Sequence, residues 1–353
     1  MNDRGHGGDI YTYQIGNEKR EVIDFSANIN PLGLCEGVKN ALYESMSMVH
    51  NYPDPNQRKL KEAIAENENI NKEWIVCGNG AADIIFRLVY AKKPGKSLVL
   101  APTFSEYEEA LKTVGCEVVY YQLKEKDKFE VQVDILEMID STLDMVWVCN
   151  PNNPTGKTID INILTKILTN CEKNDVLLVV DECFNDFIYN SQKYTLKNKL
   201  HSPNLFILKA FTKIYAVPGI RLGYGMASSS IIKSIEKVGQ TWSVSSIAQH
   251  VGVEAVKEKE YVQKTIEVIQ KQRIYLTEEL RNIGFKVYSS RTNYILFKNP
   301  YKIDLKKELE SYNILIRSCG NYRGLDQTYY RIAIRLYKEN QKLIYALKKI
   351  CLK

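Results

Sequence analysis

The chain has 353 residues, of which 44% are hydrophobic and 25% are charged, and its formal net charge is +6. This balance is typical of a globular protein, and the length favours one large domain with a smaller one. No run of like charges resembles a nucleic-acid-binding tail, and no window approaches eighteen consecutive apolar residues. We therefore expect neither a nucleic-acid partner nor a membrane span.

The eight cysteines include no Cys-x-x-Cys pair and have no set of histidines close by. Reduced thiols are the simplest account of them, and the first residues lack the apolar segment of a signal peptide. We expect a cytoplasmic protein without a metal site.

Short β-branched runs alternate with helical patterns between about residues 75 and 226. The alternation predicts a mostly parallel sheet, with strands at 97–101, 117–121, 145–149, 176–180, 205–209 and 222–226. Residues 120–128 mix charges of both signs and are interpreted as a solvated loop. Ligands of such sheets bind beyond the carboxyl ends of the strands.

Apolar positions at helical spacing predict one long helix from about 247 to 282. A second, smaller α/β domain follows, with strands at 286–289, 293–297, 314–316 and 329–334 and helices near 304–312 and 338–350. We expect residues 1–45 to form an N-terminal arm and part of the small domain, 46–265 the large domain, and 266–353 the small C-terminal domain.

Two residues with potential chemistry follow predicted strands. Asp181 comes directly after the apolar run 176–180, so its carboxylate is expected at the ligand edge of the sheet, with a helix cap as the plain alternative. Lys213 follows the strand 205–209, and Arg221 lies eight residues further on. Burial or a neighbouring cation makes a lysine amine nucleophilic, and Arg221 could supply the cation while gripping a phosphate. Taken alone, a lysine such as Lys213 is usually an ordinary surface residue, whereas an acid at a strand end is more often functional.

Two turns add to these residues. The run from Asn150 to Gly156 is a rigid turn at a strand end, where an amide can donate to a phenolate oxygen. The run from Cys77 to Asp83 precedes a helical pattern, so that its glycines and free N–H groups would form a phosphate cradle. Alone, each is more often a plain turn.

Together and in this order, these motifs resemble the fold-type-I aminotransferase superfamily, whose enzymes use pyridoxal 5′-phosphate. The resemblance implies an α/β fold like that of aspartate aminotransferase, with a large cofactor-binding domain of mostly parallel sheet and a smaller α/β domain. It implies two catalytic residues: Lys213 holds the cofactor as a Schiff base and Asp181 keeps the pyridine nitrogen protonated. The other implied cofactor contacts are Asn153 on the phenolic oxygen, Gly80, Ala81, Thr212 and Arg221 on the phosphate, and Phe104 on the ring face, with Tyr107 the less favoured stacking residue.

The same resemblance implies a homodimer with shared active sites, because Tyr52 resembles the tyrosine that relatives contribute to the partner subunit's cofactor phosphate. A buried core tyrosine is the alternative. The chain departs from many aminotransferases at Phe184, where they have Tyr, and at Ala210, where they have Ser or Thr.

Nearly the whole chain resembles one branch most, the L-threonine-O-3-phosphate decarboxylases of cobalamin biosynthesis, near relatives of the histidinol-phosphate aminotransferases. The segments that carry this resemblance are 6–8, 24–33, 52–54, 211–213, 316–319 and 329–331. The branch implies that Arg331 binds a substrate carboxylate, with Arg317 as a second anion contact. It implies that His6 and Asn28 face the substrate phosphate, unless His6 belongs only to a loose arm.

The expected activity is therefore decarboxylation of L-threonine O-3-phosphate to (R)-1-aminopropan-2-yl phosphate and CO₂, without a metal. Because no angle can be read from a sequence, the choice of decarboxylation over transamination rests on the resemblance. O-phosphoserine is an alternative substrate, and histidinol-phosphate aminotransferase or another class I/II aminotransferase is an alternative enzyme. A regulatory aminotransferase-like module is the non-enzymatic alternative, although the full cofactor set is present.

Overall fold

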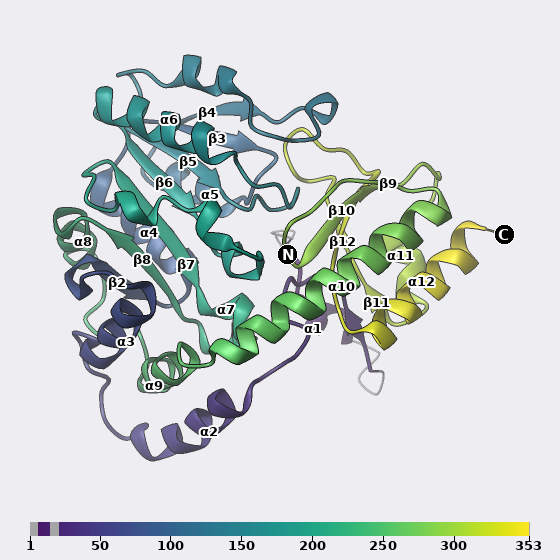
Figure 1. The fold of residues 1–353 in the computed structure, drawn as a ribbon, viewed down its shortest axis with the longest axis horizontal. Helices are drawn as coiled ribbons and strands as arrows, with labels where there is room; N and C mark the ends of the chain where they lie inside the picture. The colour runs from purple at the N-terminus through teal and green to yellow at the C-terminus, as the bar shows by residue number, and fades with distance from the viewer. Residues whose placement is uncertain (1–5, 15–20, 353) are drawn as a thin grey trace.

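The computed structural model describes residues 6–14 and 21–352 of the protein (Figure 1). A seven-stranded sheet has the order β2-β8-β7-β6-β5-β3-β4. Its strands are β2 (Ile75–Gly78), β3 (Lys96–Ala101), β4 (Glu117–Gln122), β5 (Met145–Cys149), β6 (Leu177–Asp181), β7 (Leu205–Ala210) and β8 (Gly223–Ala227). Strands β5, β6 and β7 are wholly buried, as their mostly apolar sequences require, and Asp181 of β6 and Lys209 of β7 are the charged residues among them. The mostly parallel sheet predicted from the sequence is confirmed.

Two expectations about this sheet were wrong. The run 222–226 was expected in a parallel unit, but β8 pairs antiparallel with both β2 and β7. Strand β2 was not expected, and Cys77 and Gly78, assigned to a turn, are its last two residues. The apolar pattern of a buried strand carries no information on direction, and four residues are too few to show a period.

Helices cover the large sheet and link it to the rest of the chain (Figure 1). They are α2 (Glu36–Ser45), α3 (Arg58–Glu68), α4 (Ala81–Lys92), α5 (Glu106–Lys112), α6 (Ile161–Lys173), α7 (Phe211–Ile214), α8 (Ser229–Glu236) and α9 (Ser246–Ala255). The solvated loop expected at 120–128 is only partly correct, since residues 120–122 belong to β4 and η3 (Glu125–Asp127) is a short 3-10 helix.

The single helix expected over 247–282 is wrong, because α9 ends at Ala255 and α10 (Lys259–Ile283) begins four residues later. Helix α9 packs on α2 and α3, whereas α10 packs on α12 (Tyr337–Cys351). The chain changes direction between these two layers, and apolar residues at helical spacing on both sides of the break conceal it. Figure 1 shows α10 running from the large sheet toward the smaller one.

The smaller sheet is antiparallel and has the order β12-β13-β10-β9. Its strands are β9 (Lys286–Val287), β10 (Tyr294–Lys298), β12 (Arg317–Ser318) and β13 (Tyr329–Ala333), and α11 (Leu305–Glu310) and α12 lie in the same part of the chain as predicted. The expected strand at 314–316 is divided, since β11 (Ile314–Leu315) pairs instead with β1 (Ile23–Asp24) near the N-terminus. The other N-terminal element is α1 (Ile10–Gln14). The domain limits at residues 45 and 265 stay a prediction, and residue 265 lies inside α10.

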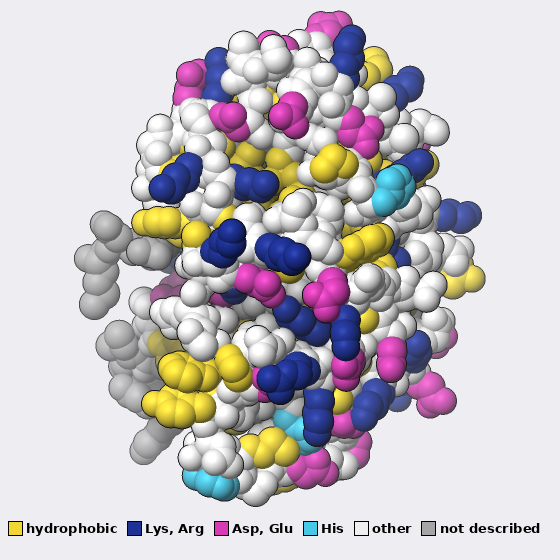
Figure 2. Space-filling view, turned by 90° about the vertical axis from the view of Figure 1, so that its left-hand side faces the viewer, with side chains coloured by type: hydrophobic (Ala, Val, Ile, Leu, Met, Phe, Trp, Pro, Cys, Tyr) yellow, Lys and Arg dark blue, Asp and Glu magenta, His cyan; other side chains and the backbone are white. Residues whose placement is uncertain are grey.

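The charged side chains are intermixed in sign on the face seen in Figure 2. Within residues 6–14 and 21–352, no helix is both long and apolar enough to cross a bilayer. The same residues contain no group of three His, Cys, Asp or Glu side chains suited to a metal ion.

Candidate active site

A cavity of about 380 Å³ opens beyond the carboxyl ends of β5, β6 and β7, the edge at which the sequence predicted a ligand. Its wall includes the last residues of these three strands, Cys149, Asp181 and Ala210. The predicted site residues that line it are His6, Asn28, Ala81, Phe104, Asn153, Asp181, Thr212, Lys213, Arg221 and Arg331. Residues from the N-terminus, the large sheet and the small sheet therefore meet in one space.

Lys213 lies on α7, the short helix that follows β7. Its side chain keeps some accessible surface because it lines the cavity, yet it is deep within the protein. Burial lowers the pKa of the Lys213 amine to about 8, and the guanidinium groups of Arg331 and Arg221 act in the same direction. A lysine that loses its proton near neutral pH can attack an aldehyde.

Asp181 is the last residue of β6 and is 5% exposed. Its Oδ1 accepts a hydrogen bond from the Cys183 N–H at 2.9 Å, and its Oδ2 accepts one from the Tyr107 hydroxyl at 2.5 Å. Burial raises the pKa of Asp181, while these hydrogen bonds act in the opposite direction. A protonated ring nitrogen would give this carboxylate a cationic partner in addition to Lys213, whose charge also lowers the pKa of Asp181.

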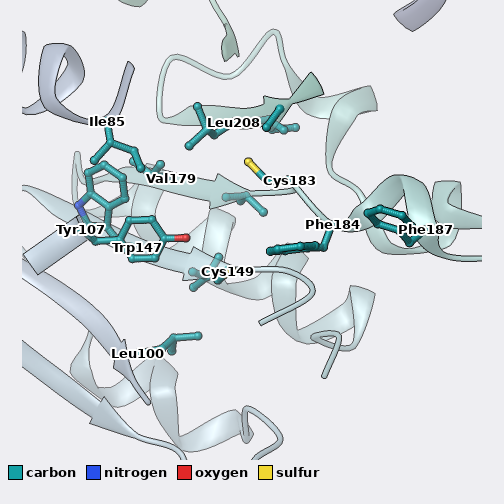
Figure 3. Close-up of a cluster of buried hydrophobic side chains, with 14 of the residues drawn as sticks. Ile85, Leu100, Tyr107, Trp147, Cys149, Val179, Cys183, Phe184, Phe187 and Leu208 are labelled. Carbon is teal, nitrogen blue, oxygen red and sulfur yellow. The ribbon is translucent and has the colours of Figure 1, made fainter. Parts of the chain in front are cut away.

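Tyr107 is a functional candidate whose role the sequence analysis did not identify. Its ring stacks on Trp147 with centroids 5.2 Å apart, and Figure 3 shows the two rings side by side in the buried cluster. This packing carries the hydroxyl to Asp181, whereas Phe104 on the preceding turn lines the cavity. Its place one turn into α5, three residues after Phe104, was the only signal for it.

The residues predicted to form a phosphate cradle meet where α4 begins, and their role as a cradle stays a prediction. Gly80 precedes the helix with φ +85°, and a Cβ there would lie 2.7 Å from Nη2 of Arg221. A Cβ on Gly223 would lie 2.6 Å from the backbone nitrogen of Ala81. The guanidinium thus reaches a helix N-terminus that no side chain caps, and Thr212 stands in the same cavity wall. Unpaired N–H groups and a guanidinium are the donors that a phosphate requires.

Arg331 extends from β13 of the small sheet and is 4% exposed. Its Nη1 donates to Oδ1 of Asn153 at 2.5 Å, and its Nη2 donates to the carbonyl oxygen of Ser26 at 2.6 Å. A guanidinium can only donate, so the Asn153 oxygen faces Arg331 and the Asn153 NH₂ group remains to donate elsewhere.

Two buried polar atoms of this wall have no hydrogen-bond partner among the described residues. They are Nε of Arg331 and Oδ1 of Asn28. Buried polar atoms rarely stay unpaired, and both residues border the cavity. They therefore mark a place where a polar ligand would bind.

The N-terminal segment closes one side of the cavity. Nε2 of His6 lies 2.9 Å from Oε1 of Glu106, and its ring is tilted against Phe104 at 5.8 Å. Gly7 packs so closely that a Cβ would overlap the carbonyl oxygen of Ser26, and the Gly8 N–H donates to the Ser26 hydroxyl at 2.8 Å. His6 is thus held at the cavity, and the alternative of a loose arm does not describe residues 6–8. Ser26 and Glu106 are contacts that the sequence analysis missed.

Arg317 and Tyr52 do not line this cavity. Arg317 borders a neighbouring hollow of about 890 Å³ that shares His6, Phe104 and Glu106 with it. Its guanidinium lies 5.3 Å from the Tyr322 ring centroid. Tyr52 is 79% exposed and stacks on Trp242 at 4.6 Å, so the alternative of a buried core tyrosine is wrong. The two departures from the aminotransferase pattern, Phe184 and Ala210, are both part of the cavity wall.

The residues that meet here fit pyridoxal phosphate. The cofactor needs an amine for its aldehyde, an acid for its ring nitrogen, a donor for its phenolic oxygen and a cradle for its phosphate. Lys213, Asp181, the Asn153 NH₂ group and the α4 N-terminus with Arg221 supply these in one cavity.

The proteins to which this chain is similar agree with a pyridoxal-phosphate site. The threonine-phosphate decarboxylase of Salmonella typhimurium is 35% identical over 350 residues, which cover 98% of this chain and 96% of that protein. The crystal structure of the histidinol-phosphate aminotransferase from Clostridium acetobutylicum superposes with a TM-score of 0.87 at 31% identity, covering 92% of this chain and 98% of that one. The L-threonine-O-3-phosphate decarboxylase from Porphyromonas gingivalis has a TM-score of 0.84 at 27% identity, covering 93% and 99%.

The family profile described as aminotransferase class I and II matches residues 20–350. This confirms the predicted fold, the enzymatic nature of the chain and its cofactor, pyridoxal 5′-phosphate. The chain belongs to the class I and II aminotransferase family of pyridoxal-phosphate enzymes.

Proposed function

We propose that the enzyme decarboxylates L-threonine O-3-phosphate to (R)-1-aminopropan-2-yl phosphate and CO₂, as a step of cobalamin biosynthesis. The observation that carries the proposal is the buried guanidinium of Arg331, whose Nε at the cavity wall has no hydrogen-bond partner within residues 6–14 and 21–352. It offers a site for a carboxylate beside Lys213. Identity of 35% over nearly the whole chain to a threonine-phosphate decarboxylase supports the same reaction.

The proposed substrate carries two anions, and the cavity offers contacts for both. Arg331 would take the carboxylate, while Asn28 and His6 lie where they could take the phosphate, with Arg317 behind them in the adjoining hollow. The NH₂ group of Asn28 can donate a hydrogen bond to the phosphate. Its Oδ1, unpaired within the described part of the chain, is an acceptor, so it would accept a hydrogen bond from a protonated phosphate oxygen or from the substrate amine. Charge-assisted hydrogen bonds at both ends would fix the orientation of the substrate.

Orientation determines which bond to Cα breaks. Bound in this cavity, pyridoxal phosphate supplies an electron sink for the charge left on Cα. Arg331 would hold the carboxylate so that the bond to CO₂ is the one aligned for cleavage, and the Lys213 amine would return a proton to Cα. Asp181 would keep its negative charge next to the ring nitrogen, supported by the Tyr107 hydroxyl.

Histidinol-phosphate aminotransferase is the second candidate. It is favoured by the structure from Clostridium acetobutylicum, at 31% identity and a TM-score of 0.87. Histidinol phosphate has no carboxylate, so this reaction would use Arg331 only for the second substrate, a 2-oxo acid.

A substrate panel separates the two candidates. The cofactor-loaded enzyme is incubated with O-phospho-L-threonine, with O-phospho-L-serine, and with L-histidinol phosphate plus 2-oxoglutarate, and both CO₂ and glutamate are measured. We expect CO₂ from phosphothreonine, and a slower release from phosphoserine because one methyl group discriminates by roughly 1–3 kcal/mol. Glutamate without CO₂ would contradict the decarboxylase and support the aminotransferase.

We propose further that two copies form a homodimer in which Tyr52 reaches the partner's cofactor phosphate. The support is an exposed group of large apolar side chains, namely Tyr43, Met46, Val49, Tyr52 and Trp242, of which each is at least 51% exposed. Figure 2 shows hydrophobic side chains gathered low on the face where α2 lies. A second copy would cover such a group. The eight cysteines are unpaired, which supports a reducing compartment such as the cytoplasm.

A further inference from the structure

We infer that Glu125 is a positioning residue, which clamps β13 to the large-sheet part of the molecule and so presets the reach of Arg331 into the active site. The inference rests on the proposed role of Arg331 as the carboxylate contact. Neither the sequence analysis nor the proposed reaction gives Glu125 a role.

Glu125 opens η3, directly after β4 of the large sheet, and its carboxylate accepts four hydrogen bonds. Oε1 accepts from Lys286 Nζ at 2.7 Å and from the Tyr288 hydroxyl at 2.5 Å. Oε2 accepts from the Tyr329 hydroxyl at 2.8 Å and from Lys298 Nζ at 3.3 Å. All four donors belong to the small sheet or the turn that leaves it, so one side chain from β4 and η3 joins β9, β10 and β13.

Apolar contacts reinforce the clamp. Phe129, four residues after Glu125, is 2% exposed and lies edge-on to the rings of Tyr288 at 5.0 Å and Tyr329 at 6.1 Å. The Lys298 ammonium lies 4.8 Å from the centroid of the Tyr329 ring. The hydrogen bonds from Lys286 and Tyr288 lower the pKa of Glu125 to about 2, so its carboxylate is charged over the whole working pH range.

The clamp acts on the strand that carries Arg331. Tyr329 and Arg331 are two residues apart on β13, so their side chains lie on the same face of that strand, with Cα atoms about 7 Å apart. The proposed cofactor contacts Asn153, Asp181, Lys213 and Arg221 all come from the large-sheet part of the chain. A shift of β13 would therefore move the carboxylate contact relative to the cofactor. Of these four cofactor contacts it would act on Asn153, whose Oδ1 accepts a hydrogen bond from Arg331, and it would leave Asp181, Lys213 and Arg221 in place.

An ion pair that only stabilised the fold would behave differently. Exposed pairs contribute little to the free energy of unfolding, and losing one would not change substrate affinity selectively. The test is the variant Glu125→Gln, in which an amide replaces the charge and turns one acceptor into a donor facing donors. Glu125→Asp keeps the charge and serves as the conservative variant. Glu117→Gln is the matched control, since Glu117 is the first residue of β4, the strand that precedes η3, and pairs with Lys96 of the large sheet at 3.3 Å.

Three quantities are measured on each protein: hydrogen exchange of the amides at 329–331, the affinity for pyridoxal phosphate, and the affinity of the loaded enzyme for O-phospho-L-threonine. We expect Glu125→Gln to speed exchange at 329–331 and to weaken phosphothreonine binding about tenfold, with a much smaller change in cofactor affinity. Glu125→Asp should recover part of the loss, and Glu117→Gln should match the parent enzyme.

Unchanged exchange at 329–331 would overturn the clamp, and so would faster exchange with intact phosphothreonine affinity. An equal loss of cofactor affinity would also overturn it, because that result describes general destabilisation. If the parent enzyme fails to bind phosphothreonine, the proposed function fails instead, and the exchange measurement still decides whether Glu125 holds β13.

Discussion

Lys209 of β7 and Lys213 of α7 are four residues apart in sequence and lie in opposite electrostatic surroundings. Lys209 Nζ donates to Glu68 Oε1 at 2.9 Å and to Asp186 Oδ1 at 2.8 Å, and these carboxylates hold the pKa of Lys209 well above its usual value in spite of burial. Lys213 has two guanidinium groups nearby, and its pKa falls to about 8. The fold therefore stabilises one buried ammonium and disfavours the other, which is the one proposed to react.

This contrast predicts that replacing Lys213 or Lys209 by methionine changes the free energy of unfolding in opposite directions. Below pH 8 the folded, cofactor-free protein keeps a charged Lys213 whose pKa is depressed from 10.5, at a cost of up to about 3 kcal/mol. That cost fades as pH rises from about 8 to 10.5, because the unfolded chain then also loses the proton. We expect Lys213→Met to raise the free energy of unfolding at pH 7 and to raise it less near pH 10, as measured by urea denaturation.

The control for this prediction is Lys209→Met. It leaves Glu68 and Asp186 without their shared cation, and breaking such a buried pair costs roughly 3–5 kcal/mol. A loss of stability in both variants at pH 7 would contradict the contrast.

At the scale of elements, the start of α4 depends on a glycine. Gly80→Ala would place a methyl group 2.7 Å from Nη2 of Arg221 and force an alanine to φ +85°. We expect this change to displace the guanidinium and to weaken pyridoxal phosphate binding by at least tenfold, measured by titration of the cofactor-free protein.

Gly115→Ala is the matched variant. Gly115 also has a positive φ, +73°, but a Cβ there has nothing within 4 Å. It should cost a similar backbone strain of about 1–2 kcal/mol and leave cofactor affinity unchanged. Equal affinities in the two variants would show that the close approach to Arg221 is not needed.

Some helices and strands could be predicted from the sequence and others could not. Strands β5, β6 and β7 were found because their buried runs are mostly apolar, and Asp181, Asn153 and Lys213 were found because each lies at or soon after a strand end. The direction of β8 and the break between α9 and α10 depend on tertiary packing and have no local pattern.

The sequence did not predict three other residues, Ser26, Tyr107 and Glu125, for a related reason. Ser26 contributes its backbone carbonyl to Arg331, which no side-chain pattern records. Tyr107 reaches Asp181 only because its ring stacks on Trp147. Glu125 stands in a segment whose mixed charges are typical of a solvated loop, and only the folded chain brings four donors to it.

At the scale of the molecule, a buried ionic network joins elements across the large sheet. Glu68 of α3 is 4% exposed and accepts hydrogen bonds from Lys209 of β7 at 2.9 Å, from Lys197 at 2.8 Å and from the Tyr224 hydroxyl of β8 at 2.6 Å. Burial alone would raise the pKa of Glu68, but the charges of Lys209 and Lys197 outweigh it and lower that pKa to about 2.

Because the pKa of Glu68 is below the usual 4.5 in the folded protein, ionisation of Glu68 stabilises the fold. The Glu68 carboxylate stabilises the fold fully above about pH 4.5, and this contribution of about 3 kcal/mol is lost as pH falls toward 2. We expect Glu68→Gln to lower the melting temperature at pH 7, with a difference from the parent that shrinks between pH 4.5 and 2. Glu62→Gln, which breaks a half-exposed pair with Lys72, should change stability by less than about 1 kcal/mol.

The hydrogen bond between Asn153 and Arg331 is a direct contact between the proposed cofactor contacts and the small sheet. A mutation in the small sheet that moves Arg331 would therefore also act on Asn153, so that the acceptance of a substrate and the holding of the cofactor are coupled through one hydrogen bond. The fold in which this coupling is built is shared with a decarboxylase and an aminotransferase, at TM-scores of 0.84 and 0.87.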